Sequence, residues 1–344
     1  MDVLPYADAK RQLDGLHRYL MLGNGFSIAL RPDIFTYGSL YENADFSAAP
    51  AVPALFDALG TQDFEIVIRH LLDTARVVEV YRPNLIRLIR RLRTDAAAIK
   101  DSLVSAIARR HPDRPYDIDP AAYAACRAFL RPFGHIYTLN YDVLLYWALM
   151  QSEVDDLKLA PDDGFRHPED DPGEPWVSWQ QAHSPTVHYL HGALHLFDAG
   201  SEIIKYTWSK TDIPIVDQIR ESLDHERYPL FVAEGSSANK KSRIMHNAYL
   251  HKALRSFESC CSNGNGSLTV FGHSLAENDR HVLRLITKGR IRKMLVSIYG
   301  DPRSAENQAI RVNCEELVRL RAAARKHQGL DVVYFDAQSA QVWG

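Results

Sequence analysis

Seven short apolar runs, most of them followed by an amphipathic helical pattern, limit the folds open to this chain. They lie at Tyr19–Leu22, His135–Thr138, Val187–Leu190, Leu230–Ala233, Leu268–Phe271, Leu295–Tyr299 and Val332–Phe335. Several lack the alternation of apolar and polar residues, as expected of strands covered on both faces. Repetition of strand, helix and strand predicts an α/β fold with a Rossmann-like, doubly wound parallel sheet.

Helical patterns fill much of the chain between these runs. The clearest are at Asn239–Glu258, Asp279–Lys288 and Ala305–His327. A longer segment, residues 45–131, separates the first two predicted strands and carries apolar residues with a 3.6-residue period. A strand crossover needs far less chain. We therefore expect a helical insertion that caps the sheet, within a single domain spanning residues 1–344.

A second irregular segment, residues 155–184, is rich in Asp, Pro and Gly. These residue types favour turns and interrupt helices and strands. The segment is therefore predicted to be a loop.

Composition excludes several classes of protein. The formal net charge is only −3 in 344 residues, which gives no electrostatic footprint for nucleic acid or an anionic membrane. The basic run at Arg87–Arg93 is predicted to be a solvated helix face. No apolar run approaches the roughly 18 residues of a membrane span, and the N-terminus lacks a secretory pattern. The four cysteines include no C-x-x-C pair, so a reduced, cytoplasmic protein is predicted.

The turn Gly23-Asn24-Gly25 follows the first predicted strand and precedes a predicted helix. This arrangement presents backbone N–H groups to a phosphate, and glycine lets the ligand come close. The third position of the dinucleotide-binding pattern is filled by Ile28 rather than glycine. The alternative is a tight turn in which Ser27 caps the next helix.

Polar residues also follow the second strand. Thr138, Asn140 and Asp142 alternate at its end, and ligands of open α/β sheets lie outside the carboxyl ends of the strands. These residues are therefore candidates for a binding crevice. The alternative is an Asx turn with Asp142 capping the following helix.

Three further strand ends carry similar signals. His191-Gly192 follows one of them, and imidazole titrates near neutral pH, as a general base must; a purely structural histidine is the alternative. The others offer glycine, serine, histidine and charged residues: Glu234, Lys240, Gly272, His273 and Ser274. A solvated helix residue is the alternative for Lys240. Together these residues suit a crevice that binds a nucleotide.

The order of these motifs, G-x-G-x-S, T-x-N-x-D, H-G and G-x-S, resembles the sirtuin (SIR2) family. The chain is similar to a SIR2-like bacterial branch of the DUF4917 type, in which "EGSS" and "FGHSL" occur in this order. Deacetylase sirtuins carry a zinc module with two C-x-x-C pairs, which this chain lacks. The resemblance therefore implies no metal and no zinc-dependent protein deacetylation. It points instead to antiphage NADases of abortive infection.

The resemblance implies an NAD⁺ glycohydrolase that yields nicotinamide and ADP-ribose. Asn140 would hold the ribose or the attacking water, His191 would act as general base, and Asp142 would orient the carboxamide or the Asn140 loop. NAD⁺ would be bound by residues at the other strand ends, namely Gly23, Asn24, Gly25, Ser27, Thr138, Gly192, Glu234, Lys240, Gly272, His273 and Ser274.

Two other functions stay open at this point. The crevice could sense NAD⁺ or an ADP-ribose derivative without cutting it, as a module of a defence complex. An NAD-dependent dehydrogenase is the other, but the missing third glycine counts against it. Expected partners are a second copy of the chain, a defence-system protein or a phage trigger.

Overall fold

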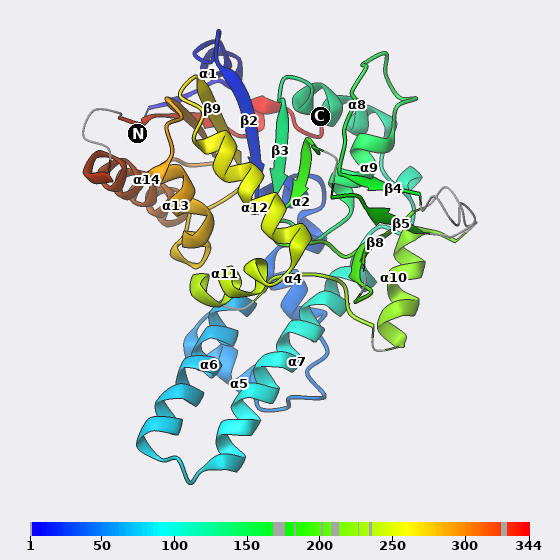
Figure 1. The fold of residues 1–344 in the computed structure, drawn as a ribbon, viewed down its shortest axis with the longest axis vertical. Helices are drawn as coiled ribbons and strands as arrows, with labels where there is room; N and C mark the ends of the chain where they lie inside the picture. The colour runs from blue at the N-terminus through cyan, green and yellow to red at the C-terminus, as the bar shows by residue number, and fades with distance from the viewer. Residues whose placement is uncertain are drawn as a thin grey trace.

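The structure is a computed structural model that describes residues 2–167, 176–181, 184–200, 202–207, 213–225, 227–233, 236–324 and 329–344. Two sheets and a set of helices make up this part of the chain (Figure 1). No helix within it is long and apolar enough to cross a membrane.

The larger sheet has seven strands, and every neighbouring pair is parallel. Its order is β1 (Val3–Leu4), β11 (Asp331–Asp336), β10 (Lys293–Ile298), β9 (Gly266–Phe271), β2 (His17–Leu22), β3 (His135–Thr138) and β6 (Val187–Tyr189). Helices flank the sheet, which explains why β3, β6 and β9 are almost wholly buried along their length. The predicted Rossmann-like, doubly wound fold is confirmed.

Six of the seven predicted strands lie in this sheet, and the prediction for Leu230–Ala233 is wrong. That segment makes only an isolated antiparallel bridge, between Phe231 and Gly192. Leu230, Val232 and Ala233 are nevertheless fully buried. An apolar run reports burial, and here burial comes from packing over the end of β6 instead of from a place in the sheet.

The helices match the predicted pattern with one exception. The segment Asn239–Glu258 forms two helices, because Asn247 caps the second through the Leu250 N–H. The helices are α1 (Tyr6–Arg11), α2 (Gly25–Leu30), α3 (Pro32–Phe35), α4 (Tyr37–Glu42), α5 (Val52–Leu59), α6 (Phe64–Tyr81), α7 (Ile86–Arg110), α8 (Pro120–Leu130), α9 (Leu144–Met150), α10 (Ile215–Asp224), α11 (Ser237–Met245), α12 (Ala248–Cys261), α13 (Arg280–Lys288) and α14 (Ala305–Ala324). Short 3₁₀ turns lie at Pro115–Asp117, Glu277–Asp279 and Gln338–Ala340.

The insertion between β2 and β3 is helical, as predicted for residues 45–131. Its longest helices, α6 and α7, pack against each other as a hairpin that projects from the body of the molecule (Figure 1). The base of the hairpin joins the main core, since Phe64 and Val104 belong to the same buried cluster as the strands. The basic run Arg87–Arg93 lies on α7 and exposes all four of its arginines, as predicted.

A second, antiparallel sheet corrects the prediction of a loop at residues 155–184. Its order is β4 (Phe165–Arg166), β5 (Trp176–Trp179), β8 (Ile203–Tyr206) and β7 (Leu196–Asp198). β4 and β5 fall inside the predicted loop. Asp, Pro and Gly residues around these short strands concealed them, because so few residues give no periodic signal.

Candidate functional site

The carboxyl ends of four neighbouring strands meet at one edge of the large sheet. In the order β9, β2, β3, β6, the residues Phe271, Leu22, Thr138 and Tyr189 are in register. The residues two positions beyond them form what we call the polar row: His273, Asn24, Asn140 and His191. The strands that follow β2 along the chain, β3 and β6, lie on one side of it in the sheet, whereas those that follow β9, namely β10 and β11, lie on the opposite side. The topological switch point, where open α/β sheets bind ligands, therefore lies between β2 and β9.

The two glycine turns touch each other at this switch point. The Gly25 N–H donates to the carbonyl oxygen of Gly272 at 2.9 Å. A Cβ on Gly25 would lie 2.5 Å from the Gly272 Cα, and a Cβ on Gly272, whose φ is +69°, would lie 2.6 Å from the Gly25 Cα. Both residues must be glycine for the backbones to approach this closely.

Two amides of the Gly23–Gly25 turn are already engaged within the protein: the Gly23 N–H donates to the Phe271 carbonyl oxygen and the Gly25 N–H to that of Gly272. The Phe26 N–H donates to the Gly23 carbonyl oxygen and the Ser27 N–H to the Asn24 carbonyl oxygen. The Asn24 side-chain amide donates to the carbonyl oxygen of Phe35. A pyrophosphate bound here would have to replace these hydrogen bonds, so the predicted phosphate-binding role stays a prediction.

A buried hydrogen-bonded triplet joins α2 to the end of β3. The Ser27 hydroxyl donates to Asp142 Oδ2 at 2.5 Å and accepts from the Asn140 side-chain amide at 2.9 Å. Asp142 Oδ1 accepts the Leu144 N–H at 2.9 Å, which is the Asx turn considered for this motif. The Thr138 hydroxyl accepts the Asn140 backbone N–H at 3.1 Å. Ser27 therefore tethers the asparagine loop and does not cap α2.

The triplet is closed to solvent in this conformation. Ser27, Asn140 and Asp142 are 0%, 7% and 5% exposed. Burial raises the pKa of the Asp142 carboxyl, although the hydrogen bond from Ser27 opposes the shift. Any ligand that reaches Asn140 must first open this part of the molecule.

Gly192 is also fixed by packing. Its φ is +77°, and a Cβ there would lie 1.9 Å from the Leu230 carbonyl oxygen. The bridge to Phe231 brings that backbone across the end of β6. The glycine therefore positions His191 by letting the segment after α10 lie directly against the turn.

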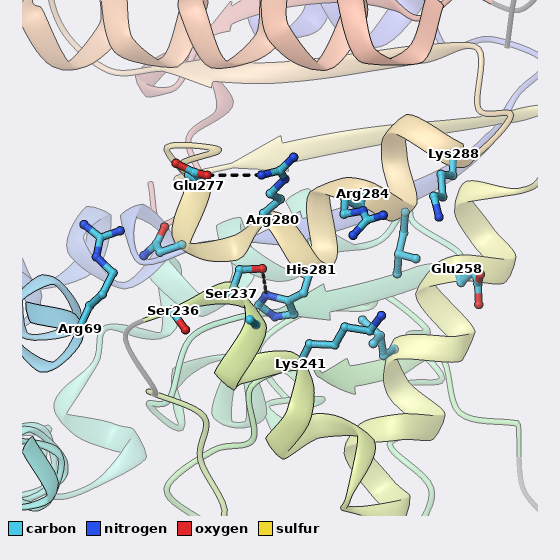
Figure 2. A pocket seen from close by; sticks show the side chains of 14 residues that line it. Arg69, Ser236, Ser237, Lys241, Glu258, Glu277, Arg280, His281, Arg284 and Lys288 are labelled. Atoms are coloured by element: carbon cyan, nitrogen blue, oxygen red, sulfur yellow. Dashed lines mark hydrogen bonds and ion pairs between the residues drawn. The ribbon is translucent and has the colours of Figure 1, made fainter. Parts of the chain in front are cut away.

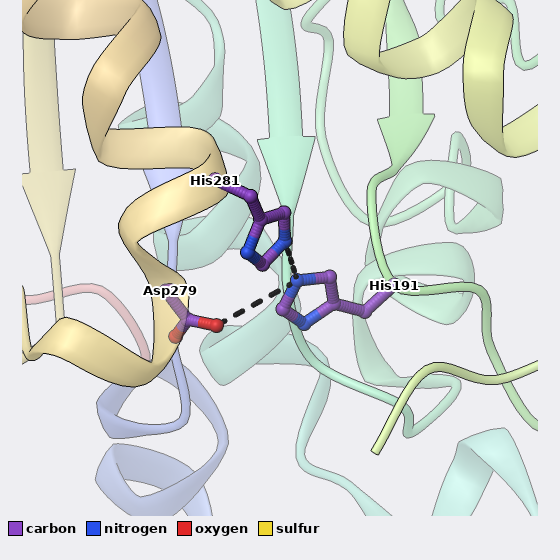
Figure 3. A group of neighbouring side chains, drawn as sticks. All are labelled: His191, Asp279 and His281. Atoms are coloured by element: carbon purple, nitrogen blue, oxygen red, sulfur yellow. Dashed lines mark hydrogen bonds and ion pairs between the residues drawn. The ribbon is translucent and has the colours of Figure 1, made fainter. Parts of the chain in front are cut away.

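His191 faces a second histidine, His281 of α13. Their Nε2 atoms lie 3.1 Å apart (Figure 3). The opposite nitrogen of His281, Nδ1, lies 3.3 Å from the Ser237 hydroxyl. Burial lowers the pKa of His191 well below its usual value and lowers that of His281 to about 4. Both rings are therefore neutral near pH 7, and a hydrogen bond between them requires one Nε2 to carry the proton and the other to accept it.

A buried ion cluster lies beside this pair. Lys240 Nζ is 2.8 Å from Asp279 Oδ1 and 2.7 Å from Glu65 Oε2, and the lysine is 1% exposed. The alternative of a solvated Lys240 is wrong. Asp279 Oδ2 is 2.9 Å from His273 Nε2, and Asp279 Oδ1 is 3.7 Å from His191 Nε2. The outer members of the polar row thus reach one carboxylate.

Each charged group of the cluster stabilises the ionised form of its partners. Burial acts to lower the pKa of Lys240, but the carboxylates of Glu65 and Asp279 raise it above its usual value. Burial likewise acts to raise the pKa of Asp279, but Lys240 and His273 hold it well below the usual range. Removal of one partner would leave an uncompensated charge in the interior.

Tyr141 connects the triplet to the ion cluster. Its hydroxyl lies 2.8 Å from the Val232 carbonyl oxygen and 3.2 Å from Glu65 Oε1. Between Asn140 and His191 no direct hydrogen bond occurs in the part of the chain that the structure describes. The two predicted catalytic residues follow neighbouring strands and are connected through Tyr141, Glu65, Lys240 and Asp279.

Among the residues that the structure describes, His191, Asp279 and His281 form the group that could hold a metal ion. One ligand atom from each lies within 4.8 Å of the others, and two neutral imidazoles with a carboxylate suit zinc or iron. Lys240 already donates to Asp279 Oδ1, so a metal ion would compete with an ammonium group for that oxygen. The expectation of a metal-free site stays a prediction.

The turn after β9 holds a strained residue. Leu275 is buried with φ +55°, a conformation that bulky residues rarely adopt. Its N–H donates to His273 Nδ1 at 2.9 Å, which leaves the other ring nitrogen of His273 to donate to Asp279. The strained backbone at Leu275 therefore places the N–H group that orients the His273 ring.

One predicted residue lies apart from this network, and several members were missed. Ser274 is exposed, while the prediction for Glu234 falls outside the described residues. The missed members are Glu65, Asn278, Asp279 as an ion partner, and His281. The "GHSLAEND" stretch contained Asp279 without revealing its partner, whereas nothing in the sequence singled out Glu65 within the helical insertion.

A cavity of about 780 Å³ opens next to the ion cluster, among α6, α11, α12 and α13 (Figure 2). His281 and Asn278 form part of its wall. Asn278 donates to Glu65 at 2.8 Å, so the cavity borders the buried cluster at two points.

The family model described as "Domain of unknown function (DUF4917)" matches residues 20–343, which include the whole polar row. Comparison with curated proteins finds none that matches the chain.

Proposed function

The chain belongs to the DUF4917 family, and we propose that it is an NAD⁺ glycohydrolase that releases nicotinamide and leaves ADP-ribose. The observation that carries the proposal is the common position of Asn140 and His191, two residues beyond the paired Thr138 and Tyr189 of neighbouring strands. The ordered SIR2-like motifs give this pair of residues its chemical interpretation.

The proposed chemistry assigns one task to each polar side chain. Nicotinamide leaves as a neutral molecule, so catalysis must stabilise the positive charge that develops on the ribose. Asn140, held by Ser27, orients the ribose or the attacking water. His191 is neutral and accepts a proton from that water or from a ribose hydroxyl. Asp142 fixes the Asn140 loop through the same serine.

The closed crevice supports an enzyme that is inactive until triggered. Asn140 and His191 are only 7% and 2% exposed, so NAD⁺ needs a conformational opening to reach them. An enzyme that drains NAD⁺ must be kept inactive in a healthy cell. We therefore propose an effector of abortive infection, opened by a phage component or a partner protein.

The test is nicotinamide release from NAD⁺, measured by chromatography in phage-challenged cells that express the protein, where the trigger is present. His191→Ala and Asn140→Ala should each lower turnover about 10²–10⁴-fold, as loss of a general base commonly does. His225→Ala, on an exposed histidine after α10, is the matched control and should retain full activity. Equal turnover in wild type and both site variants contradicts the catalytic assignment.

A sensing module is the second candidate, and the burial of the same side chains favours it. Such a protein would bind NAD⁺ or an ADP-ribose derivative and leave the nicotinamide–ribose bond intact. Two results together would establish this function in place of catalysis. Calorimetry with the purified protein would show NAD⁺ binding, and neither the purified protein nor cells challenged with phage would release nicotinamide.

Self-association is also proposed, through the tip of the α6–α7 hairpin. Val80, Tyr81 and Ile86 are 78%, 79% and 61% exposed there. Light scattering of the wild type and of Val80→Asp with Ile86→Asp tests this: the double substitution should lower the mass to that of one chain.

A further inference from the structure

The cavity among α6, α11, α12 and α13 is strongly basic. Five cations line it, namely Arg69, Lys241, Arg280, Arg284 and Lys288. Two carboxylates, Glu258 and Glu277, also line it, which leaves an excess of three positive charges. This surplus contrasts with the net charge of −3 for the whole chain.

Three of these cations form no ion pair with any residue that the structure describes. Arg280 lies 3.5 Å from Glu277, and Glu258 is engaged by Arg255 outside the cavity wall. Among the described residues, Arg69, Lys241 and Arg284 form no ion pair. Cations gathered around a concave surface raise the local concentration of anions.

Neutral donors complete the wall. The first turn of α11 opens into the cavity with Ser236 and Ser237, and contains no acidic residue that would repel an anion. The N-terminal end of a nine-residue helix adds the positive end of its dipole. A cavity of about 780 Å³ is within the size range of small-molecule sites.

We propose that this cavity binds the diphosphate group of a nucleotide-type ligand. Arg69, Lys241 and Arg284 neutralise the charge, and the α11 serines donate hydrogen bonds (Figure 2). The diphosphate belongs either to the dinucleotide substrate or to a separate phosphorylated effector.

The site communicates with the polar row through His281. Ser237 lies on one side of that ring at 3.3 Å from Nδ1, and His191 on the other at 3.1 Å from Nε2. A phosphate that takes the Ser237 hydroxyl removes a partner from His281 Nδ1. The protonated nitrogen of His281 can then change, and with it the hydrogen bond offered to His191. This coupling rests on the proposed role of His191, whereas the binding itself does not.

The test is calorimetric titration of the full chain with ADP and with inorganic pyrophosphate. Both should bind the wild type, and Lys241→Glu with Arg284→Glu should weaken binding at least 10-fold. Both side chains are exposed, so the double variant should fold normally. The matched control is Lys158→Glu with Arg303→Glu, which makes the same charge change at exposed positions elsewhere and should leave binding intact. Absence of binding to the wild type, or equal binding by both double variants, overturns the proposal.

Two further measurements identify the source of the diphosphate and separate this proposal from the catalytic one. If the substrate supplies it, the pocket variant raises KM for NAD⁺ and pyrophosphate inhibits competitively. If an effector supplies it, KM is unchanged and ADP alters kcat in the wild type alone. His191→Ala should bind ADP like the wild type. Binding of ADP without any NAD⁺ cleavage, in phage-challenged cells as well as in vitro, therefore rejects the proposed function and keeps the diphosphate site.

Discussion

Two neighbouring regions at the carboxyl edge of the sheet differ in what fills them. The glycine crevice at the switch point, formed by Gly23–Gly25 and Gly272, is closed by contact of the two backbones. The cavity between α11 and α13 is open, and three of its cations form no ion pair within the described chain. The position that topology marks for a phosphate is thus packed shut, while the charge that a phosphate requires lies beside it.

The difference shows that a glycine-rich turn after a strand has two physical causes. Glycine can leave room for a ligand, or it can leave room for another part of the backbone. In this conformation Gly25 and Gly272 do the second. The ion cluster of Lys240, Glu65 and Asp279 lies between the two regions, so substitutions there should reveal how strongly they are coupled.

The largest effect is expected from Lys240→Met. This change leaves Glu65 and Asp279 buried without their cation and should lower the free energy of unfolding by about 3–5 kcal/mol. Lys241→Met, at the next and exposed position, should stay within about 0.5 kcal/mol of the wild type. Urea unfolding of both variants measures the contrast, and equal stabilities would show that the cluster does not hold the two regions together.

A similar contrast between matched glycines tests the packed crevice. Gly272→Ala combines strain at φ +69° with a Cβ 2.6 Å from the backbone of Gly25. We expect a loss of about 2–4 kcal/mol from the left-handed conformation and the overpacking together. Gly300→Ala has φ +70° with no atom within 4 Å, and should cost only about 1–2 kcal/mol. Indistinguishable losses would mean that the two turns are not in close contact.

Stability should fall in mild acid because of the histidine pair. The folded state holds the pKa of His281 at about 4, whereas an unfolded histidine titrates near 6.5. Between these values the unfolded state binds more protons, so stability falls as the pH falls, by up to about 1.4 kcal/mol per pH unit for this residue. Unfolding of His281→Gln from pH 7 to pH 4 should show a shallower dependence than the wild type. His225→Gln should leave the pH dependence of stability as it is in the wild type. If His281→Gln also leaves it unchanged, the His281 ring is not buried in its neutral form.

Chelation should have the smallest effect. Lys240 supplies the positive charge at Asp279, so treatment with EDTA should leave both the melting temperature and nicotinamide release unchanged. Elemental analysis checks the outcome independently. Stoichiometric zinc or iron, with a lower melting temperature after its removal, would assign His191, Asp279 and His281 as ligands instead.

The sheet could be predicted from sequence because its signal is local. Strands buried on both faces read as short apolar runs, and six of the seven runs are strands of the large sheet. The run Leu230–Ala233 failed since it is buried by packing and not by pairing along a strand. The antiparallel sheet was missed because β4 has only two residues and gives no period.

The candidate site could be predicted only in part, since its charges come from distant positions. The turns after β2, β3, β6 and β9 were recognisable in the sequence, and they contain Asn24, Asn140, His191 and His273. Lys240 is paired with Glu65 and Asp279, which lie 175 and 39 residues away in the chain. Pairing over such separations depends on the folded topology, and no spacing rule could identify it in a single sequence.

The structure of the His191→Ala variant with NAD⁺ bound would show most directly whether Asn140 and His191 flank the nicotinamide ribose. We expect the nicotinamide ribose to lie against Asn140 and the vacated position of the His191 ring, with the diphosphate either beside Lys241 and Arg284 or on the Gly23–Gly25 turn. A dinucleotide bound away from Asn140 and from the position of the His191 ring would contradict the catalytic assignment.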